Sequence, residues 1–222
     1  MSEEASIDGD PKPTMTKARV DVFVFDTMAD WEAAYAMAGI NNPEFQLEPG
    51  RYRVLTVGIS KDVVTSMGGL RIRPDLALDE LSPNTSAMLI LPGGFAWENG
   101  GNSQAIEKAR EFIDAGVPVA AICAATLALA RAGLLDDRLH TSNAPEYIAY
   151  SNYHGQEHYR AVAAITDRGV ITASGIAPVD FAYEIFKMLG LYKGEVLEAW
   201  FALNKTGDPA KFFELMRVAN PS

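Results

Sequence analysis

The chain has 222 residues, of which 48% are hydrophobic and 22% are charged, and its formal net charge at pH 7 is −10. This length and composition suit one α/β domain with a sizeable core, and the acidic balance argues against nucleic acid or an anionic membrane as a partner. The single cysteine excludes an intramolecular disulfide and a multi-cysteine zinc site.

Residues 1–17 are polar and lack the apolar core of a signal peptide, so we predict a disordered tail followed by one domain over 18–222. No run of residues is long and apolar enough to span a membrane, and we expect a cytoplasmic protein. The first half of the domain alternates apolar runs with helical patterns. We predict strands over 19–25, 51–59 and 87–91, helices over 31–38 and 103–115, and a hairpin over 63–73.

The second half continues in the same way. We predict a strand that ends at Cys123, a helix from there to about 133, a strand over 138–142, a helix over 144–150, a hairpin of 161–166 with 170–173, and helices over 178–189, 195–203 and 212–218. Apolar strands that alternate with helices predict a doubly wound, mostly parallel α/β sheet with helices on both faces, a flavodoxin-like sandwich. Ligands bind beyond the carboxyl ends of the strands in such folds.

Cys123 lies where an apolar strand turns into a helix rich in small residues. Ala121 and Ala125 occupy the two positions that glycine holds in the G-x-S-x-G nucleophile elbow, where the strained turn leaves no room for larger side chains. The helix N-terminus favours negative charge, so we expect a thiol with a lowered pKa that acts as a nucleophile. The alternative is a buried cysteine that only packs.

Glu32 follows the first strand, at the start of a helix, and is predicted to point into the same crevice as Cys123. A carboxyl group that keeps its proton there would donate a hydrogen bond to sulfur, which stabilises the thiolate while the pKa of the carboxyl rises. The alternative is an ordinary first-turn glutamate that the helix dipole favours.

Four segments together resemble the ThiJ/PfpI superfamily, which has the class I glutamine amidotransferase-like fold, and within it the branch related to the parkinsonism-associated deglycase. The segments are Asp30-Trp31-Glu32, Leu91-Pro92-Gly93-Gly94, Ala121-Ile122-Cys123-Ala124 and the stretch 171–178. The resemblance runs from about 19 to 191. It implies that Cys123 is the nucleophile, that Glu32 is its protonated partner, that the N–H groups of Gly94 and Ala124 form an oxyanion hole, and that the protein is a homodimer.

Two positions depart from the pattern of the superfamily. Ala124 stands where the similar intracellular proteases have the histidine that acts as the base, which argues against peptidase activity. The deglycase-related branch has a histidine about twenty residues after the cysteine, and Asn143 takes that position here. His140 lies three residues upstream and is expected to face the other side of a strand. Asn143 is therefore predicted to orient a carbonyl substrate by hydrogen bonding.

Two other features are candidates for binding roles. Trp97 is predicted either to wall the pocket or to pack in the core. The stretch from His154 to His158 matches the H-x-x-E-H zinc signature, but Gly155 favours a loop over a helix, so we predict no metal. We expect this loop to lie over the crevice and to bring His154 or Tyr153 to the site. The glycine pairs match no phosphate-binding motif, so we expect no cofactor.

These features together predict a cysteine-dependent protein that acts on small electrophiles such as reactive aldehydes, with glyoxalase-like or deglycase-like chemistry. Two alternatives stay open. One is a non-catalytic thiol sensor of oxidative stress, because an accessible thiolate oxidises readily. The other is an amidotransferase-like interaction domain whose cysteine is merely buried.

Overall fold

Seven of the apolar runs form one sheet, whose strand order is β5-β2-β1-β6-β7-β9-β8. The structure is a computed structural model that describes residues 18–220, so the predicted tail over 1–17 lies outside the described residues. All neighbouring strands are parallel except β8 and β9, which pair antiparallel. The strands are β1 (Ala18–Phe23), β2 (Tyr52–Gly58), β5 (Leu76–Ala77), β6 (Ser86–Leu91), β7 (Val119–Ile122), β8 (Ala164–Asp167) and β9 (Val170–Ala173). The predicted doubly wound, mostly parallel sheet is confirmed.

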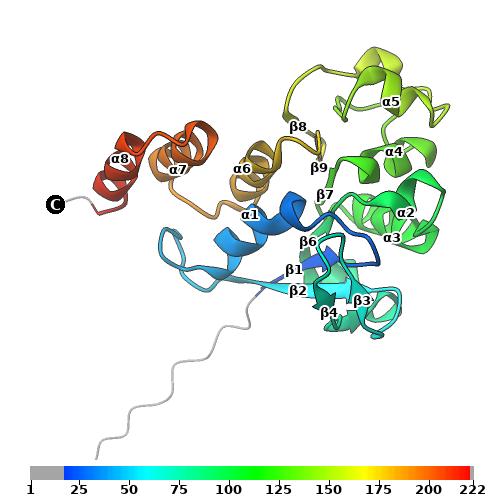
Figure 1. The fold of residues 1–222 in the computed structure, drawn as a ribbon, viewed down its shortest axis with the longest axis horizontal. Coiled ribbons are helices and arrows are strands. Elements are labelled where there is room, and N and C mark those ends of the chain that lie inside the picture. The colour runs from blue at the N-terminus through cyan, green and yellow to red at the C-terminus, as the bar shows by residue number, and fades with distance from the viewer. Residues whose placement is uncertain (1–17, 221–222) are drawn as a thin grey trace, which may run out of the picture.

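Helices cover both faces of the sheet and create two hydrophobic cores. One core lies against α1, α6 and α7, and the other against α2, α3 and α4. Figure 1 shows α6, α7 and α8 following one another away from the sheet toward the C-terminus. The helices are α1 (Asp30–Asn41), α2 (Phe95–Glu98), α3 (Ser103–Asp114), α4 (Ala124–Arg131), α5 (Pro145–Ala149), α6 (Pro178–Leu189), α7 (Gly194–Thr206) and α8 (Ala210–Ala219), with short 3-10 turns at Leu78–Glu80, Pro83–Thr85 and Gln156–His158.

The helices of residues 18–220 include none with both the length and the apolar character needed to cross a bilayer.

The carboxyl ends of β1, β6 and β7 meet at one edge of the sheet, because these strands are parallel neighbours. The chain leaves β1 on one side to form β2 and returns on the other side to form β6. Such a reversal of strand order opens a crevice above the sheet, where ligands bind in doubly wound folds. The fold therefore brings the start of α1, the loop after β6 and Cys123 together.

The predicted strand over 138–142 is wrong. His140 makes only an isolated bridge to Tyr159, and the N–H of Thr141 donates to the side-chain oxygen of Thr172 at 2.9 Å instead of to a strand backbone. Side-chain acceptors thus replace the regular ladder and keep this segment out of the sheet. The hairpin over 63–73 is confirmed as β3 (Val64–Thr65) and β4 (Arg71–Ile72).

Candidate active site

Cys123 is the single residue between β7 and α4, and its backbone is strained, with φ 59° and ψ −127°. A residue with a side chain in such a conformation typically costs about 1–3 kcal/mol. Hydrogen bonds hold the turn in place. Its N–H donates to the Ala173 carbonyl at 3.0 Å, and its carbonyl accepts from the N–H and the hydroxyl of Thr126 at 3.0 and 2.6 Å. The strand-to-helix turn thus lifts the sulfur above the sheet.

Two glycines leave the space that the Cys123 side chain occupies. A Cβ at Gly93 would lie 2.7 Å from Cys123 Cβ, and a Cβ at Gly175 would lie 2.8 Å from Cys123 Sγ. Both would also crowd the carboxyl oxygens of Glu32. The loops after β6 and β9 can therefore close over the sulfur only because these residues have no side chain.

Glu32 lies in the first turn of α1, with 1% of its surface exposed. Its Oε2 accepts a hydrogen bond from the Gly93 N–H at 2.5 Å, while the buried Oε1 has no partner of standard geometry. Burial raises the pKa of this carboxyl to about 7, against the lowering effects of the Gly93 N–H and of the Cys123 thiol.

Asn143 bridges the sulfur and the loop that covers it. Its Nδ2 donates to Cys123 Sγ at 3.3 Å, and its Oδ1 accepts from the Gly175 N–H at 2.9 Å. The carbonyl of Gly175 in turn accepts from the indole N–H of Trp31 at 3.2 Å. Asn143 thus lies beside the nucleophile, at the position where the sequence predicted a substrate-orienting amide.

The pKa of the Cys123 thiol is raised to about 11, opposite to the direction that the sequence predicted. Burial and the negative charge of Glu32 raise this pKa by more than the N–H groups of Asn143 and Ala124 lower it. The pair therefore loses its first proton near pH 7 and keeps its second proton until about pH 11. A thiolate forms at this site when Glu32 accepts that proton.

A pocket of about 470 Å³ opens at the sulfur. Its walls come from the start of α1, the elbow, the segment after residue 140 and the β9–α6 loop, and they consist of Trp31, Glu32, Cys123, Asn143, Ser174, Gly175, Ile176 and Pro178. Glu32 and Cys123 are the titratable members of this set.

Trp97 and His154 do not line this pocket. Trp97 is fully buried among the core residues, and its indole N–H donates to the Pro92 carbonyl at 2.8 Å. Of the two alternatives predicted for Trp97, the structure therefore shows the one in which it packs in the core. His154 is exposed in a loop, where its N–H donates to Asp136, and the loop does not bring it to the crevice. The structure therefore does not bring Trp97 or His154 into the pocket at Cys123.

The remaining predicted positions are Gly94 and His140. A Cβ at Gly94 would lie 2.7 Å from the Thr27 carbonyl and 2.8 Å from the Phe25 ring, so the missing side chain makes room for protein rather than for a ligand. His140 is buried and its Nε2 pairs with the Tyr153 hydroxyl at 3.0 Å, away from the sulfur as predicted. Within residues 18–220, no three His, Cys, Asp or Glu side chains are placed to hold a metal ion.

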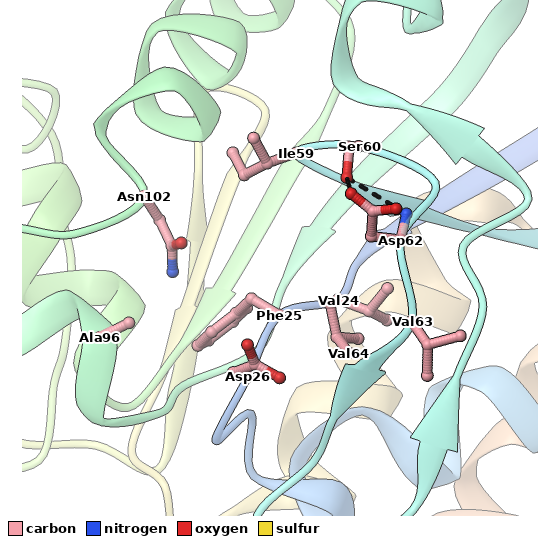
Figure 2. A pocket seen from close by; sticks show the side chains of 10 residues that line it. All are labelled: Val24, Phe25, Asp26, Ile59, Ser60, Asp62, Val63, Val64, Ala96 and Asn102. Atoms are coloured by element: carbon pink, nitrogen blue, oxygen red, sulfur yellow. Dashed lines mark hydrogen bonds between the residues drawn. The ribbon is translucent and has the colours of Figure 1, made fainter.

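A second cavity of about 300 Å³ lies at the ends of β1 and β2 (Figure 2). It shares no residue with the pocket at the sulfur. Its acidic residues already have partners, since Asp26 accepts from the Thr65 N–H and Asp62 accepts from the Ser60 hydroxyl. The reactive side chains therefore belong to the Cys123 pocket.

Comparison with known proteins agrees with this geometry, since residues 18–188 match the DJ-1/PfpI family. The chain belongs to the DJ-1/PfpI family. This assignment confirms the resemblance to the ThiJ/PfpI superfamily that the sequence motifs indicated, and it places the strained cysteine and the buried glutamate within that family's fold.

Relatives in this family have different names. One from Bacillus subtilis (strain 168), named an uncharacterized protease (YoaZ), is 40% identical over 209 residues, or 93% of this chain and 100% of the relative. One from Pyrococcus abyssi (strain GE5 / Orsay), named a deglycase, is 34% identical over 125 residues, or 56% of this chain and 71% of the relative. The crystal structure of a thiJ/pfpI family protein from Bacillus anthracis has a TM-score of 0.84 at 42% identity, covering 91% of this chain and 97% of that one.

Sequence reasoning gave no packing role to Gly93 or Gly175, and it missed the hydroxyl of Thr126, which positions the elbow. This hydroxyl lies 2.7 Å from that of Ser142, so it links the elbow to the segment that carries Asn143. The glycine-containing loops after β6 and β9 gave a signal for close approach of the backbone. Nothing in the sequence marks Thr126.

The Gly175→Ala substitution tests the packing around the sulfur. The added Cβ would overlap Cys123 Sγ, so we expect a loss of about 1–3 kcal/mol in the free energy of unfolding and slower alkylation of Cys123. Urea denaturation and intact mass after iodoacetamide measure the two effects. Gly194→Ala is the control, because a Cβ there meets no atom within 4 Å. Equal behaviour of the two variants would contradict the tight packing.

The raised pKa of Glu32 predicts a pH-dependent cost in stability. The folded state keeps this proton up to about pH 7, whereas the unfolded chain releases it near 4.5, so folding is favoured at low pH and the advantage disappears as pH rises through that window. We expect Glu32 to reduce the free energy of unfolding by about 3 kcal/mol between pH 4 and 8. Urea denaturation of the wild type and Glu32→Gln at both values measures it, and parallel pH curves would refute the burial argument.

Proposed function

We propose that the protein is a cysteine-dependent enzyme that acts on small carbonyl electrophiles, with glyoxalase-like or deglycase-like chemistry. The observation that carries this proposal is the buried Glu32 carboxyl beside the strained, partly buried Cys123, which lines a pocket. A nucleophile and one proton carrier in a pocket are sufficient for addition to an aldehyde. The relative that is named a deglycase supports the same class of reaction.

The first step forms a bond between Cys123 Sγ and the aldehyde carbon and breaks the π bond of the carbonyl. The thiol proton passes to Glu32, and Glu32 returns it to the oxygen, which gives a hemithioacetal. With an α-oxoaldehyde, Glu32 then moves a proton from the hemithioacetal carbon to the neighbouring carbonyl carbon, while the proton of the hemithioacetal hydroxyl passes to the neighbouring carbonyl oxygen. The product is a thioester of a 2-hydroxy acid, which water hydrolyses to release the acid and restore the thiol.

The pocket supplies hydrogen-bond donors for the charge that develops in these steps. The Ala124 N–H contacts the sulfur and lies at the start of α4, and the Asn143 amide donates to the same atom. From the resemblance to the ThiJ/PfpI superfamily we assign the N–H groups of Gly94 and Ala124 to the oxyanion, which fixed donors stabilise with little reorganisation. Asn143 then orients the substrate oxygen relative to the sulfur by hydrogen bonding.

Peptidase chemistry has less support from the geometry. The chain has three histidines, and none of them lines the pocket. His140 is buried against Tyr153, His154 lies in an exposed loop, and His158 lies near Glu157. An amide substrate requires protonation of its leaving nitrogen, and a single buried carboxyl already engaged with the thiol is a poor source of that second proton.

Turnover of methylglyoxal to lactate tests the proposal. Cys123→Ser and Glu32→Gln should each lower kcat/KM at least 100-fold, because one removes the nucleophile and the other removes the proton carrier. Asp62→Asn, in the second cavity, should retain wild-type activity. Full activity of Cys123→Ser would overturn the mechanism. A wild type that turns over no carbonyl compound but gains two oxygens at Cys123 in mild peroxide would instead indicate the thiol sensor.

A further inference from the structure

The pocket at Cys123 is larger than a three-carbon aldehyde requires. Its volume of about 470 Å³ compares with roughly 30 Å³ for one liquid water molecule and falls in the range of pockets that hold drug-sized ligands. A neighbouring cavity of about 400 Å³ shares Asn143, Ser174 and Ile176 with it. The space beside the sulfur can therefore accept an electrophile with a bulky substituent.

Trp31 forms one wall of that space and is held in place there. Half of its surface is exposed, yet its indole N–H donates to the Gly175 carbonyl at 3.2 Å. The Gly175 N–H is itself bound to Asn143, whose amide reaches the sulfur. An indole fixed through its polar edge offers a rigid apolar surface at a small entropic cost to a ligand.

Ile176 stands at the junction of the two cavities with 94% of its surface exposed. It belongs to the short loop between β9 and α6, next to the glycine that packs on the sulfur. Single exposed apolar side chains are common on protein surfaces. Here the exposed isoleucine lies in one pocket with Trp31 and Pro178, so three apolar side chains gather beside a nucleophile.

The same walls contain no positive charge. Lysine, arginine and histidine are absent from the described residues that line the pocket at the sulfur, and Glu32 is the one carboxyl among them. Lys205 lines the neighbouring cavity, where its Nζ already pairs with Asp180 at 2.6 Å. A carboxylate on the ligand would lose its hydration without gaining a counter-ion, and it would be repelled by Glu32 once that group ionises. A neutral substituent meets neither penalty.

We infer that Trp31, Ile176 and Pro178 form a subsite that binds a flat, uncharged, apolar group, so that Cys123 reacts preferentially with aryl-substituted neutral carbonyl compounds. The inference names the substrate class of the proposed enzyme and rests on Cys123 as the reacting atom. It does not require turnover, because any reagent that alkylates the thiol must enter the same pocket.

Three chloromethyl carbonyl reagents that differ in one substituent test the subsite: phenacyl chloride, chloroacetone and chloroacetate. In each reaction the bond from Sγ to the methylene carbon forms, chloride leaves, and the thiol proton is released. Second-order rate constants from intact mass are divided by those of N-acetylcysteine at the same pH, which removes intrinsic reactivity. We expect the normalised rate for phenacyl chloride to be at least tenfold higher than that for chloroacetone. The normalised rate for chloroacetate should be at least tenfold lower than that for chloroacetone.

Variants locate the preference on the named side chains. Ile176→Ser, at a site too exposed to affect folding, should reduce the phenacyl-to-chloroacetone ratio at least threefold, and Trp31→Ala should reduce it further. Trp31→Phe keeps an aromatic wall but loses the bond to Gly175, so it should retain most of the ratio. Phe213→Ala, which removes an exposed aromatic ring from α8, is the control and should leave the ratio unchanged.

Two outcomes would overturn the subsite. One is an equal normalised rate for the aryl and methyl reagents, and the other is a ratio that Ile176→Ser and Trp31→Ala leave unchanged. Failure of the proposed function is distinguishable from both outcomes. A protein that shows the aryl preference but does not turn over methylglyoxal or phenylglyoxal would support the subsite and contradict the proposed enzymatic activity.

Discussion

The contact between the Glu32 carboxyl and the Cys123 thiol is the interaction on which the rest of the site depends. Both groups are largely withdrawn from water, and an environment of low polarity does not favour two negative charges side by side. One proton is therefore retained by the pair across the neutral range. The sulfur is a reactive thiolate when the carboxyl accepts this proton, and it is a less reactive thiol when the carboxyl does not.

The surrounding structure serves to keep that contact in place. The elbow strains the Cys123 backbone, Thr126 holds its carbonyl, and the side-chain-free Gly93 and Gly175 let two loops close over the pair. Asn143 ties the sulfur to the second of these loops. Such a site lowers the stability of the folded state through burial of Glu32 and through backbone strain, which is a common feature of functional sites.

The sequence was sufficient to predict the parallel sheet, because the apolar runs and their alternation with helices are visible as local patterns. It also identified Cys123 and Glu32, since each follows the carboxyl end of a parallel strand. It could not predict the segment around His140, where side-chain acceptors in distant parts of the chain replace a strand ladder. The burial of Trp97 was equally open, because a tryptophan in a loop suits a core or a pocket equally well.

The direction of the thiol pKa is the clearest limit of reasoning from sequence. A helix N-terminus after Cys123 indicated a lowered pKa. The opposing effects are the burial of the sulfur and the charge of Glu32, and their sizes depend on how completely α1 and the loop of Gly93 exclude water. That exclusion arises from tertiary packing, which the local motif does not encode.

The most direct test of the shared proton is the pH dependence of Cys123 alkylation by iodoacetamide, measured between pH 4 and 11 for the wild type and for Glu32→Gln. We expect the wild-type rate to rise through a step near pH 7, where the pair loses its first proton, and to rise again toward pH 11. The step near 7 should be absent from Glu32→Gln. A wild-type rate that is already maximal at pH 5, or an identical profile in the variant, would show that Glu32 and Cys123 do not share a proton.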